Sequence, residues 1–175
     1  MKEAKKDLFA SLHEDGVDAI CITTNGLWTL DGKAVMGGGC ARVCADNWPE
    51  TSRNLGGLLK NNAGVNIPYL IGVIEVENGQ SRYGELEKAY LGDQNTKLIF
   101  SFPTIDNLID GADLELIRRS AAIMMQYADA YQLRSILIGR PGAGIGGLSY
   151  YEQVKPAIQK ILDDRFTIVS FEHEE

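Results

Sequence analysis

The sequence predicts an α/β protein in which helices pack on both faces of a largely parallel sheet. In the second half of the chain, short apolar runs typical of buried strands alternate with amphipathic segments typical of helices. The chain has 175 residues, of which 45% are hydrophobic and 23% charged, as in an ordinary soluble globular protein. This length predicts one domain over residues 1–175.

The first predicted strand covers residues 17–23 (VDAICIT), a short run rich in β-branched residues. Residues 35–45 contain three consecutive glycines and continue as the start of a helix. Trp48-Pro49 interrupts this helix, because proline disfavours the helical conformation in the residue before it. Residues 50–61 are then predicted to form a second short helix.

Two further strands are predicted over residues 68–76 (PYLIGVIEV) and 97–102 (KLIFSF). Asp113 is a suitable N-cap for the clearest helix in the sequence. The apolar residues of this helix recur every three or four positions and form one stripe: Leu114, Ile117, Ala121, Met124, Ala128 and Tyr131.

The last elements are a strand over 135–139 (SILIG), a glycine-rich loop over 140–149, a helix over 150–162 and a strand over 166–171 (FTIVSF). One face of that helix is expected to carry Tyr151, Val154, Ile158 and Ile161. Ligands of such sheets sit beyond the carboxyl ends of the strands, so both glycine-rich segments are expected at that edge.

The overall charge limits the classes of partner. The net charge of −7 and the pI near 4.9 argue against salt-driven binding to nucleic acid or to anionic membranes. A small phosphorylated ligand remains compatible, because backbone amides at a helix N-terminus hold phosphate without cationic side chains. No apolar run approaches the roughly 18 residues of a membrane span, and no signal-peptide core follows Met1 to Asp7. We therefore expect the protein to be cytoplasmic. At this size we also expect a monomer.

The cysteines do not form a disulfide framework. Cys21, Cys40 and Cys44 are sparse and odd in number. A zinc site would need further ligands, and His13 and His173 lack metal-like spacing. We expect neither a metal nor a cofactor.

The loop at residues 140–147 (RPGAGIGG) lies between a predicted strand and a predicted helix. Gly142, Gly144 and Gly147 match the dinucleotide fingerprint G-x-G-x-x-G, and Glu172 lies 25 residues beyond Gly147, near the place of a ribose-binding acid. This pattern alone would indicate NAD binding. That fingerprint, however, normally opens a domain, and here 28 residues follow it. The backbone amides of such a loop still favour an anion.

A second glycine-rich segment, residues 32–41 (GKAVMGGGCA), also leads into a predicted helix. Two such loops at one edge of a sheet can hold the two phosphates of a diphosphate from opposite sides. Lys33 and Arg140 flank the loops and are candidates to offset phosphate charge, although solvated surface is the commoner place for such residues.

Several segments in the right order resemble the macrodomain family. They are Asp18–Asn25 (DAICITTN), Ala34–Ala41 (AVMGGGCA), Ser101–Pro103 (SFP), Arg140–Leu148 (RPGAGIGGL) and Leu162–Phe166 (LDDRF). The resemblance spans nearly the whole chain. It implies a three-layer α/β/α sandwich around a mixed, largely parallel sheet, and binding of ADP-ribose or a related nucleotide derived from NAD.

The resemblance also implies roles for particular residues. Asp7 would accept a hydrogen bond from the adenine amino group, Leu8 would contact the same region, Asn25 would lie near the distal ribose, and Phe171 would pack against adenine. Lys6 stands where the family usually has glycine. Two loops would surround the diphosphate and distal ribose: the first comprises Val35, Met36, Gly37, Gly38, Gly39, Cys40 and Ala41, and the second Pro141, Gly142, Ala143, Gly144, Ile145, Gly146 and Gly147.

Each of these residues has a plain structural alternative. Asp7 would cap the short helix that follows it, Asn25 would form a turn with Gly26, and Phe171 would be a core residue.

Turnover is a separate question from binding. Hydrolysis of an ADP-ribosyl linkage needs an activated water or a nucleophile. The second loop carries Ile145 and no carboxylate, and neither loop contains histidine. Asn25 is the candidate catalytic residue, orienting the distal ribose while a ligand phosphate positions water. We expect hydrolysis of an ADP-ribosyl linkage on a macromolecule or of ADP-ribose 1″-phosphate. The alternative is a module that reads or sequesters the nucleotide without turnover.

Overall fold

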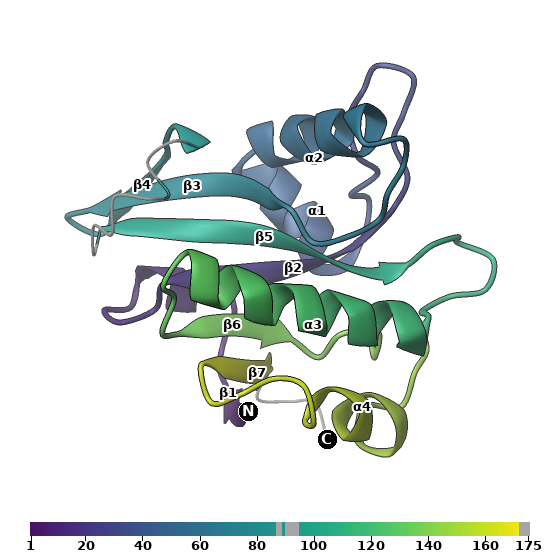
Figure 1. The fold of residues 1–175 in the computed structure, drawn as a ribbon. Coiled ribbons are helices and arrows are strands. Elements are labelled where there is room, and N and C mark those ends of the chain that lie inside the picture. The colour runs from purple at the N-terminus through teal and green to yellow at the C-terminus, as the bar shows by residue number, and fades with distance from the viewer. Residues whose placement is uncertain (87–88, 90–94, 172–175) are drawn as a thin grey trace.

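A computed structural model describes residues 1–86, 89 and 95–171 of the chain. Its centre is a seven-stranded sheet with the order β1-β7-β6-β2-β5-β3-β4 (Figure 1). The strands are β1 (Lys2–Lys5), β2 (Ala19–Asn25), β3 (Leu70–Glu77), β4 (Gln80–Tyr83), β5 (Thr96–Ile105), β6 (Ile136–Gly139) and β7 (Phe166–Ser170). In this order, all neighbouring strands from β1 to β5 are parallel. Strand β3 pairs antiparallel with both β5 and β4. The predicted mixed, largely parallel sheet is confirmed.

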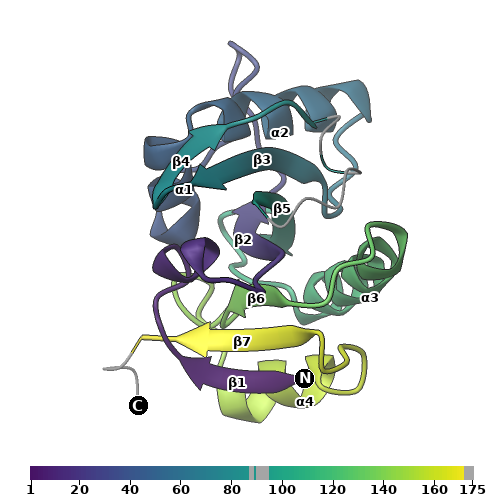
Figure 2. The same ribbon diagram turned by 90° about the vertical axis from the view of Figure 1, so that its left-hand side faces the viewer.

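Helices cover both faces of the sheet, which confirms the three layers (Figures 1 and 2). On one face lie α1 (Gly39–Asn47) and α2 (Glu50–Asn61), and on the other α3 (Leu114–Ala130) and α4 (Lys155–Ile158). Successive side chains of β2 point to opposite faces of the sheet, so the strand contributes to the core on both sides. Ala19 and Cys21 belong to the core cluster under α3 and α4, whereas Ile20 and Ile22 belong to the cluster under α1 and α2.

The predicted start of the clearest helix and most of its apolar stripe are confirmed. The Asp113 side chain accepts hydrogen bonds from the amides of Glu115 and Leu116, which caps α3. Ile117, Ala121, Met124 and Ala128 of the predicted stripe are fully buried. The predicted break at Trp48-Pro49 also separates α1 from α2.

The predicted helix over 150–162 is wrong at both ends. A π-helical turn, η3 (Tyr150–Val154), precedes the short α4, and turns follow. A π turn is wider than an α turn and so shifts the phase of the apolar face. Tyr150 is therefore buried and donates a hydrogen bond from its hydroxyl to Glu3 Oε1 (2.9 Å), whereas the predicted face residue Tyr151 is 56% exposed.

The two strands at the edges of the sheet, β1 and β4, were not expected from the sequence. Both are short and mostly exposed, and β1 (KEAK) has the charged composition common in edge strands. The Met1 ammonium group bonds Asp164 Oδ1 (2.7 Å), which ties β1 to the segment before β7.

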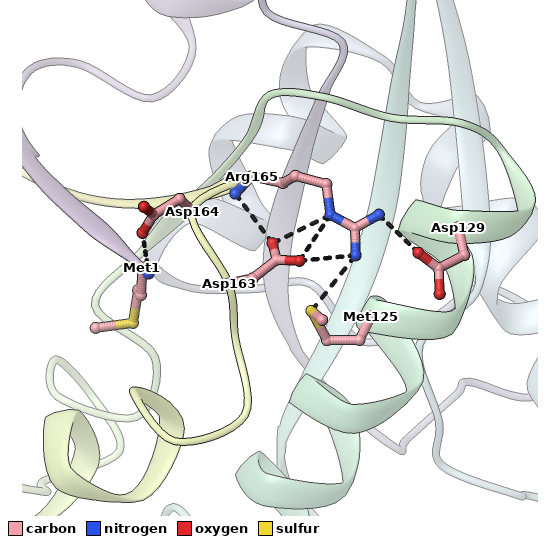
Figure 3. A network of polar contacts seen from close by, with 6 residues as sticks. All are labelled: Met1, Met125, Asp129, Asp163, Asp164 and Arg165. Carbon is pink, nitrogen blue, oxygen red and sulfur yellow. Dashed lines mark hydrogen bonds and ion pairs between the residues drawn. The ribbon is translucent and has the colours of Figure 1, made fainter.

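Figure 3 shows the polar network around Arg165, at the amino end of β7. Its guanidinium group contacts both carboxylate oxygens of Asp163 and donates to Asp129 Oδ1 of α3 (2.7 Å). The hydrogen bond from Arg165 lowers the pKa of Asp163. The segment Leu162–Phe166 thus fixes the start of β7, at the edge of the sheet opposite the carboxyl ends of its parallel strands.

None of the helices in the described part of the chain combines the length and apolar character needed to cross a membrane.

Candidate functional site

A cleft of about 1160 Å³ opens at the carboxyl ends of the parallel strands. Its floor is formed by residues 23–25 at the end of β2, 104–105 at the end of β5, 139–140 at the end of β6 and 169–170 at the end of β7. Because these strands are parallel, their carboxyl ends meet at one edge of the sheet, where α/β proteins bind ligands.

The first glycine-rich loop forms one wall, and all its predicted residues, 35–41, line the cleft. Gly38 is the N-cap of α1 and has no side chain to bond the first-turn amides. The amides of Gly39, Cys40 and Ala41 precede the first intrahelical hydrogen bond, which Arg42 donates to Gly38 O (3.2 Å). This end of the helix therefore presents partial positive charge to the cleft.

The second loop forms the facing wall through residues 142–146. Two predicted residues of this loop do not line the cleft. Pro141 is buried, and Gly147, at φ 79°, turns the chain away towards η3. Ile145 is 78% exposed, and its Cδ1 would lie 2.9 Å from a Cβ added at Gly38. The two loops therefore approach each other across the cleft.

Asp7 and Phe171 lie at the β1/β7 end of the cleft, and both line it. Asp7 Oδ1 accepts hydrogen bonds from the amides of Phe9 and Ala10 (both 2.8 Å). Asp7 therefore caps the helical turn that follows it and also lines the cleft. Phe171 follows the last residue of β7 rather than ending that strand, and it is 55% exposed. It is therefore not a core residue. Leu8 lines the cleft and is buried in the core.

Asn25 lies at the opposite end of the cleft, on β2. Its Oδ1 accepts a hydrogen bond from the Leu27 amide (3.0 Å), which is the turn that the sequence also allowed. This bond fixes the side chain and leaves the Nδ2 group as the donor available to a ligand. Asn25 therefore combines the structural role with a place in the cleft wall.

Sequence reasoning missed a cation–aromatic group at the rim of the cleft. The Arg140 guanidinium lies over the rings of Tyr150 (4.8 Å) and Tyr151 (5.1 Å) and donates to the Tyr151 hydroxyl (3.0 Å). All three residues line the cleft. The tyrosines carry no motif, and the π turn that orients them has no signal in the sequence.

Few charged residues line the cleft among those described: Lys6, Asp7 and Arg140. Lys6 pairs with Glu14 (2.9 Å). Lys33, the other predicted cation, pairs with Asp31 (3.7 Å) and does not line the cleft. An anion here would therefore be held mainly by backbone amides, with the Arg140 guanidinium in the wall of the cleft as a further partner for its charge.

Of the three cysteines, Cys40 alone lines the cleft, and its Sγ lies 3.0 Å from Thr23 Oγ1. Burial raises the pKa of the Cys21 thiol well above its ordinary value and that of Cys44 to about 12. No group of three metal-ligating side chains occurs in the described part of the chain. Glu172 and His173 lie outside the described residues.

A second hollow of about 530 Å³ lies on the other side of Phe9, which lines both. Trp48, His13 and Arg82 are among its walls. Neither glycine-rich loop reaches it, so the larger cleft is the better candidate for a phosphorylated ligand.

The described fold and cleft define an α/β/α sandwich whose ligand site lies at the carboxyl edge of a mixed sheet. Solved structures share this architecture. The macrodomain of Thermus aquaticus DarG has a TM-score of 0.66 and 22% identity, over 98% of this chain and 97% of that one. The macrodomain of Mycobacterium tuberculosis DarG has a TM-score of 0.63 and 22% identity, over 96% and 95%. The chain therefore has the macrodomain fold.

A third similar structure is Thermosipho africanus DarTG in complex with ADP-ribose. It has a TM-score of 0.67 and 17% identity, and the match covers 97% of this chain but 41% of that one. No protein-family model and no curated protein matches the sequence.

Proposed function

We propose that the protein binds ADP-ribose, or a close derivative of it, in the cleft between the two glycine-rich loops. The observation that carries this proposal is the helix N-terminus of α1 facing a second amide-rich loop across the cleft. This arrangement suits the diphosphate in the middle of the ligand. A structure of similar fold, the Thermosipho africanus DarTG, was solved with ADP-ribose.

The length of the cleft supports the same ligand. The end of β7 and the end of β5 are three strand spacings apart, about 14 Å. An extended dinucleotide-like ligand would reach from Asp7 and Phe171 to Asn25, with its diphosphate between the loops. Adenine would lie at the β1/β7 end and the distal ribose at the β2/β5 end.

We also propose that the ligand is a conjugate that the protein hydrolyses, with Asn25 orienting the distal ribose. The fixed Asn25 amide favours this role. Among the described residues that line the cleft, no histidine occurs, and the carboxylate of Asp7 caps a helical turn at the other end. Water would therefore be positioned by a phosphate of the ligand. The substrates would be ADP-ribosylated macromolecules or ADP-ribose 1″-phosphate.

The scarcity of acid–base groups equally favours a non-catalytic module that reads or sequesters ADP-ribose, which is the second candidate function. Product formation separates the two.

Calorimetric titration with ADP-ribose, using AMP and NAD as controls, tests the binding proposal. We expect saturable binding of ADP-ribose in preference to AMP, weakened by Asp7→Ala at the adenine end and by Gly144→Val between the loops. Absence of binding would overturn the ligand assignment.

Chromatography of ADP-ribose 1″-phosphate and of an ADP-ribosylated peptide after incubation tests turnover. Release of phosphate or of ADP-ribose, lost in Asn25→Ala, supports hydrolysis. Binding without product supports the module. Conversion between NAD and NADH would contradict both.

A further inference from the structure

Thr24 is one of the residues in the floor of the cleft, between Thr23 and Asn25 at the end of β2. The residue is 5% exposed. Among the residues that the structure describes, one buried side-chain oxygen or nitrogen atom has no hydrogen-bond partner, and this atom is Thr24 Oγ1. Buried hydroxyl groups in proteins are almost always hydrogen-bonded, and an unmade bond is costly. The missing hydrogen bond therefore indicates a partner that is not part of the folded chain.

The backbone opposite Thr24 already has its own hydrogen bonds. The register between β2 and β5 shifts here, so that Thr24 pairs with Pro103 and Asn25 with Ile105. The carbonyl of Pro103 accepts from Ser120 Oγ (2.9 Å), that of Thr104 from the Asp113 amide (2.9 Å) and that of Ile105 from Asn66 Nδ2 (3.2 Å). In contrast with Thr24, the neighbouring Thr23 hydroxyl has a partner, Cys40 Sγ.

Rotation about χ1 is the simplest way for this hydroxyl to reach a ligand. Thr24 lines the cleft, but its Oγ1 is closed to solvent, so the accessible area of the residue lies on its other atoms. A step of about 120° between staggered rotamers carries Oγ1 to the position of Cγ2, and Cγ2 to that of the hydrogen on Cβ. Since Oγ1 has no bond to break among the described residues, the rotation sacrifices no hydrogen bond.

We propose that Thr24 is a specificity-determining residue whose hydroxyl hydrogen-bonds a hydroxyl of the distal ribose. This inference rests on the proposed function. Thr24 precedes Asn25, at the β2/β5 end of the cleft, away from Asp7 and Phe171. A threonine hydroxyl both donates and accepts, as does a sugar hydroxyl. The loop amides suit the diphosphate, so the role left for Thr24 is recognition of the sugar beyond it.

Calorimetry of the full chain with ADP-ribose and with ADP tests the assignment, because ADP keeps the diphosphate and lacks the distal ribose. Thr24→Val keeps the shape and removes the hydroxyl. We expect it to weaken ADP-ribose binding about tenfold, the effect of one hydrogen bond, and to leave ADP binding unchanged. Its melting temperature without ligand should equal or exceed that of the wild type, since the unpartnered hydroxyl is gone.

Two further variants make the result independent of how valine packs. Thr24→Ser keeps the hydroxyl and should retain ADP-ribose affinity within about threefold, a change smaller than one hydrogen bond. Thr24→Ala removes the hydroxyl and should show the same selective loss as valine.

The outcomes separate the two levels of inference. A wild-type protein that binds neither nucleotide overturns the proposed function, and the role of Thr24 with it. Wild-type binding that is unchanged in Thr24→Val and Thr24→Ala overturns the role of Thr24 alone. Equal losses for ADP and ADP-ribose also overturn it, because the residue would then shape the cleft as a whole.

Discussion

In the second glycine-rich loop, Gly142 and Gly146 lie against packed atoms, whereas Gly37 of the first loop faces open space. A Cβ at Gly146 would lie 2.6 Å from Ala112 Cβ and 2.7 Å from Gly142 O. A Cβ at Gly37 would meet nothing within 4 Å. Hydrogen bonds also hold the second loop: Leu148 N donates to Gly142 O (2.9 Å), and Ala112 N, in the segment before α3, donates to Gly146 O (3.1 Å).

This difference shows that similar glycine patterns serve different purposes in the two loops. The second loop packs against α3 and the segment before it through Gly142 and Gly146, whereas a Cβ added at Gly144 or Gly147 would meet nothing within 4 Å. The first loop leads into the N-terminus of α1, whose leading amides precede the first intrahelical hydrogen bond. One loop is thus largely preformed, and the other is the more open partner for the ligand.

The largest effect is expected from Gly146→Ala. The added methyl group would collide with backbone, which cannot move as a flexible side chain can, so we expect a loss of about 3 kcal/mol in the free energy of unfolding. Gly144→Ala is the matched control in the same loop and should change stability by less than about 0.5 kcal/mol. Urea unfolding measures both. Equal losses in the two variants would remove the distinction between them.

Reactivity of Cys40 tests the openness of the first loop. Cys40 is half-buried in the cleft, whereas Cys21 and Cys44 are buried. A thiol-reactive probe should label Cys40 first, and ADP-ribose at about 100 times its Kd should slow labelling on the order of a hundredfold. Mass spectrometry of peptides locates the label. Labelling that ADP-ribose leaves unchanged would contradict a ligand on this loop.

Gly144→Val tests whether the second loop also contacts the ligand. Gly144 lines the cleft and a Cβ added there would meet nothing within 4 Å, so we expect ADP-ribose affinity to fall at least about tenfold with little change in melting temperature. Gly57→Val is the control, because its Cβ also meets open space and it does not line the cleft. Retained affinity in Gly144→Val would assign the ligand to the first loop alone.

The smallest effect is expected from the ion pair between Glu3 and Lys155. Hydrogen bonds from Lys155 (2.6 Å) and Tyr150 (2.9 Å) hold the pKa of Glu3 below its ordinary value of 4.5. A lowered carboxyl pKa contributes stability above that ordinary value and loses it as the pH falls through the folded pKa. The Glu3 side chain is 40% exposed, so we expect only about 0.5 kcal/mol.

Glu3→Gln provides the measurement for this pair. Its deficit in melting temperature relative to the wild type should be fully present above pH 4.5, the ordinary pKa of the carboxyl, and should shrink as the pH falls further. A deficit that does not depend on pH would assign the role of Glu3 to packing alone.

Most of the fold could be predicted because its signals are local. Apolar β-branched runs marked β2, β3, β5, β6 and β7, and the Asp113 cap with its apolar stripe marked α3. The edge strand β1 could not be predicted, since its four residues (KEAK) carry no apolar pattern. They pair with β7, which is distant in the sequence. The π turn at Tyr150 depends on tertiary contacts with Glu3 and Arg140, which no local pattern reveals.

The candidate site was predictable to a similar extent. The glycine loops and Asn25 stand out in the sequence, and the structure brings them together. Pro141 and Gly147 belong to the second loop but do not line the cleft, because the path of the loop decides which residues line it. Thr24 gave no signal at all, since an unpartnered hydroxyl is visible only after every neighbouring donor and acceptor has been placed.

Hydrogen–deuterium exchange of the full chain, with and without ADP-ribose, tests the central claim most directly. If the ligand lies between the loops, amides of residues 35–41 and 142–147 should exchange more slowly in its presence, while the hollow beside Trp48 and Arg82 stays unchanged. Protection at that hollow, or none in either loop under saturating ADP-ribose, would contradict the account.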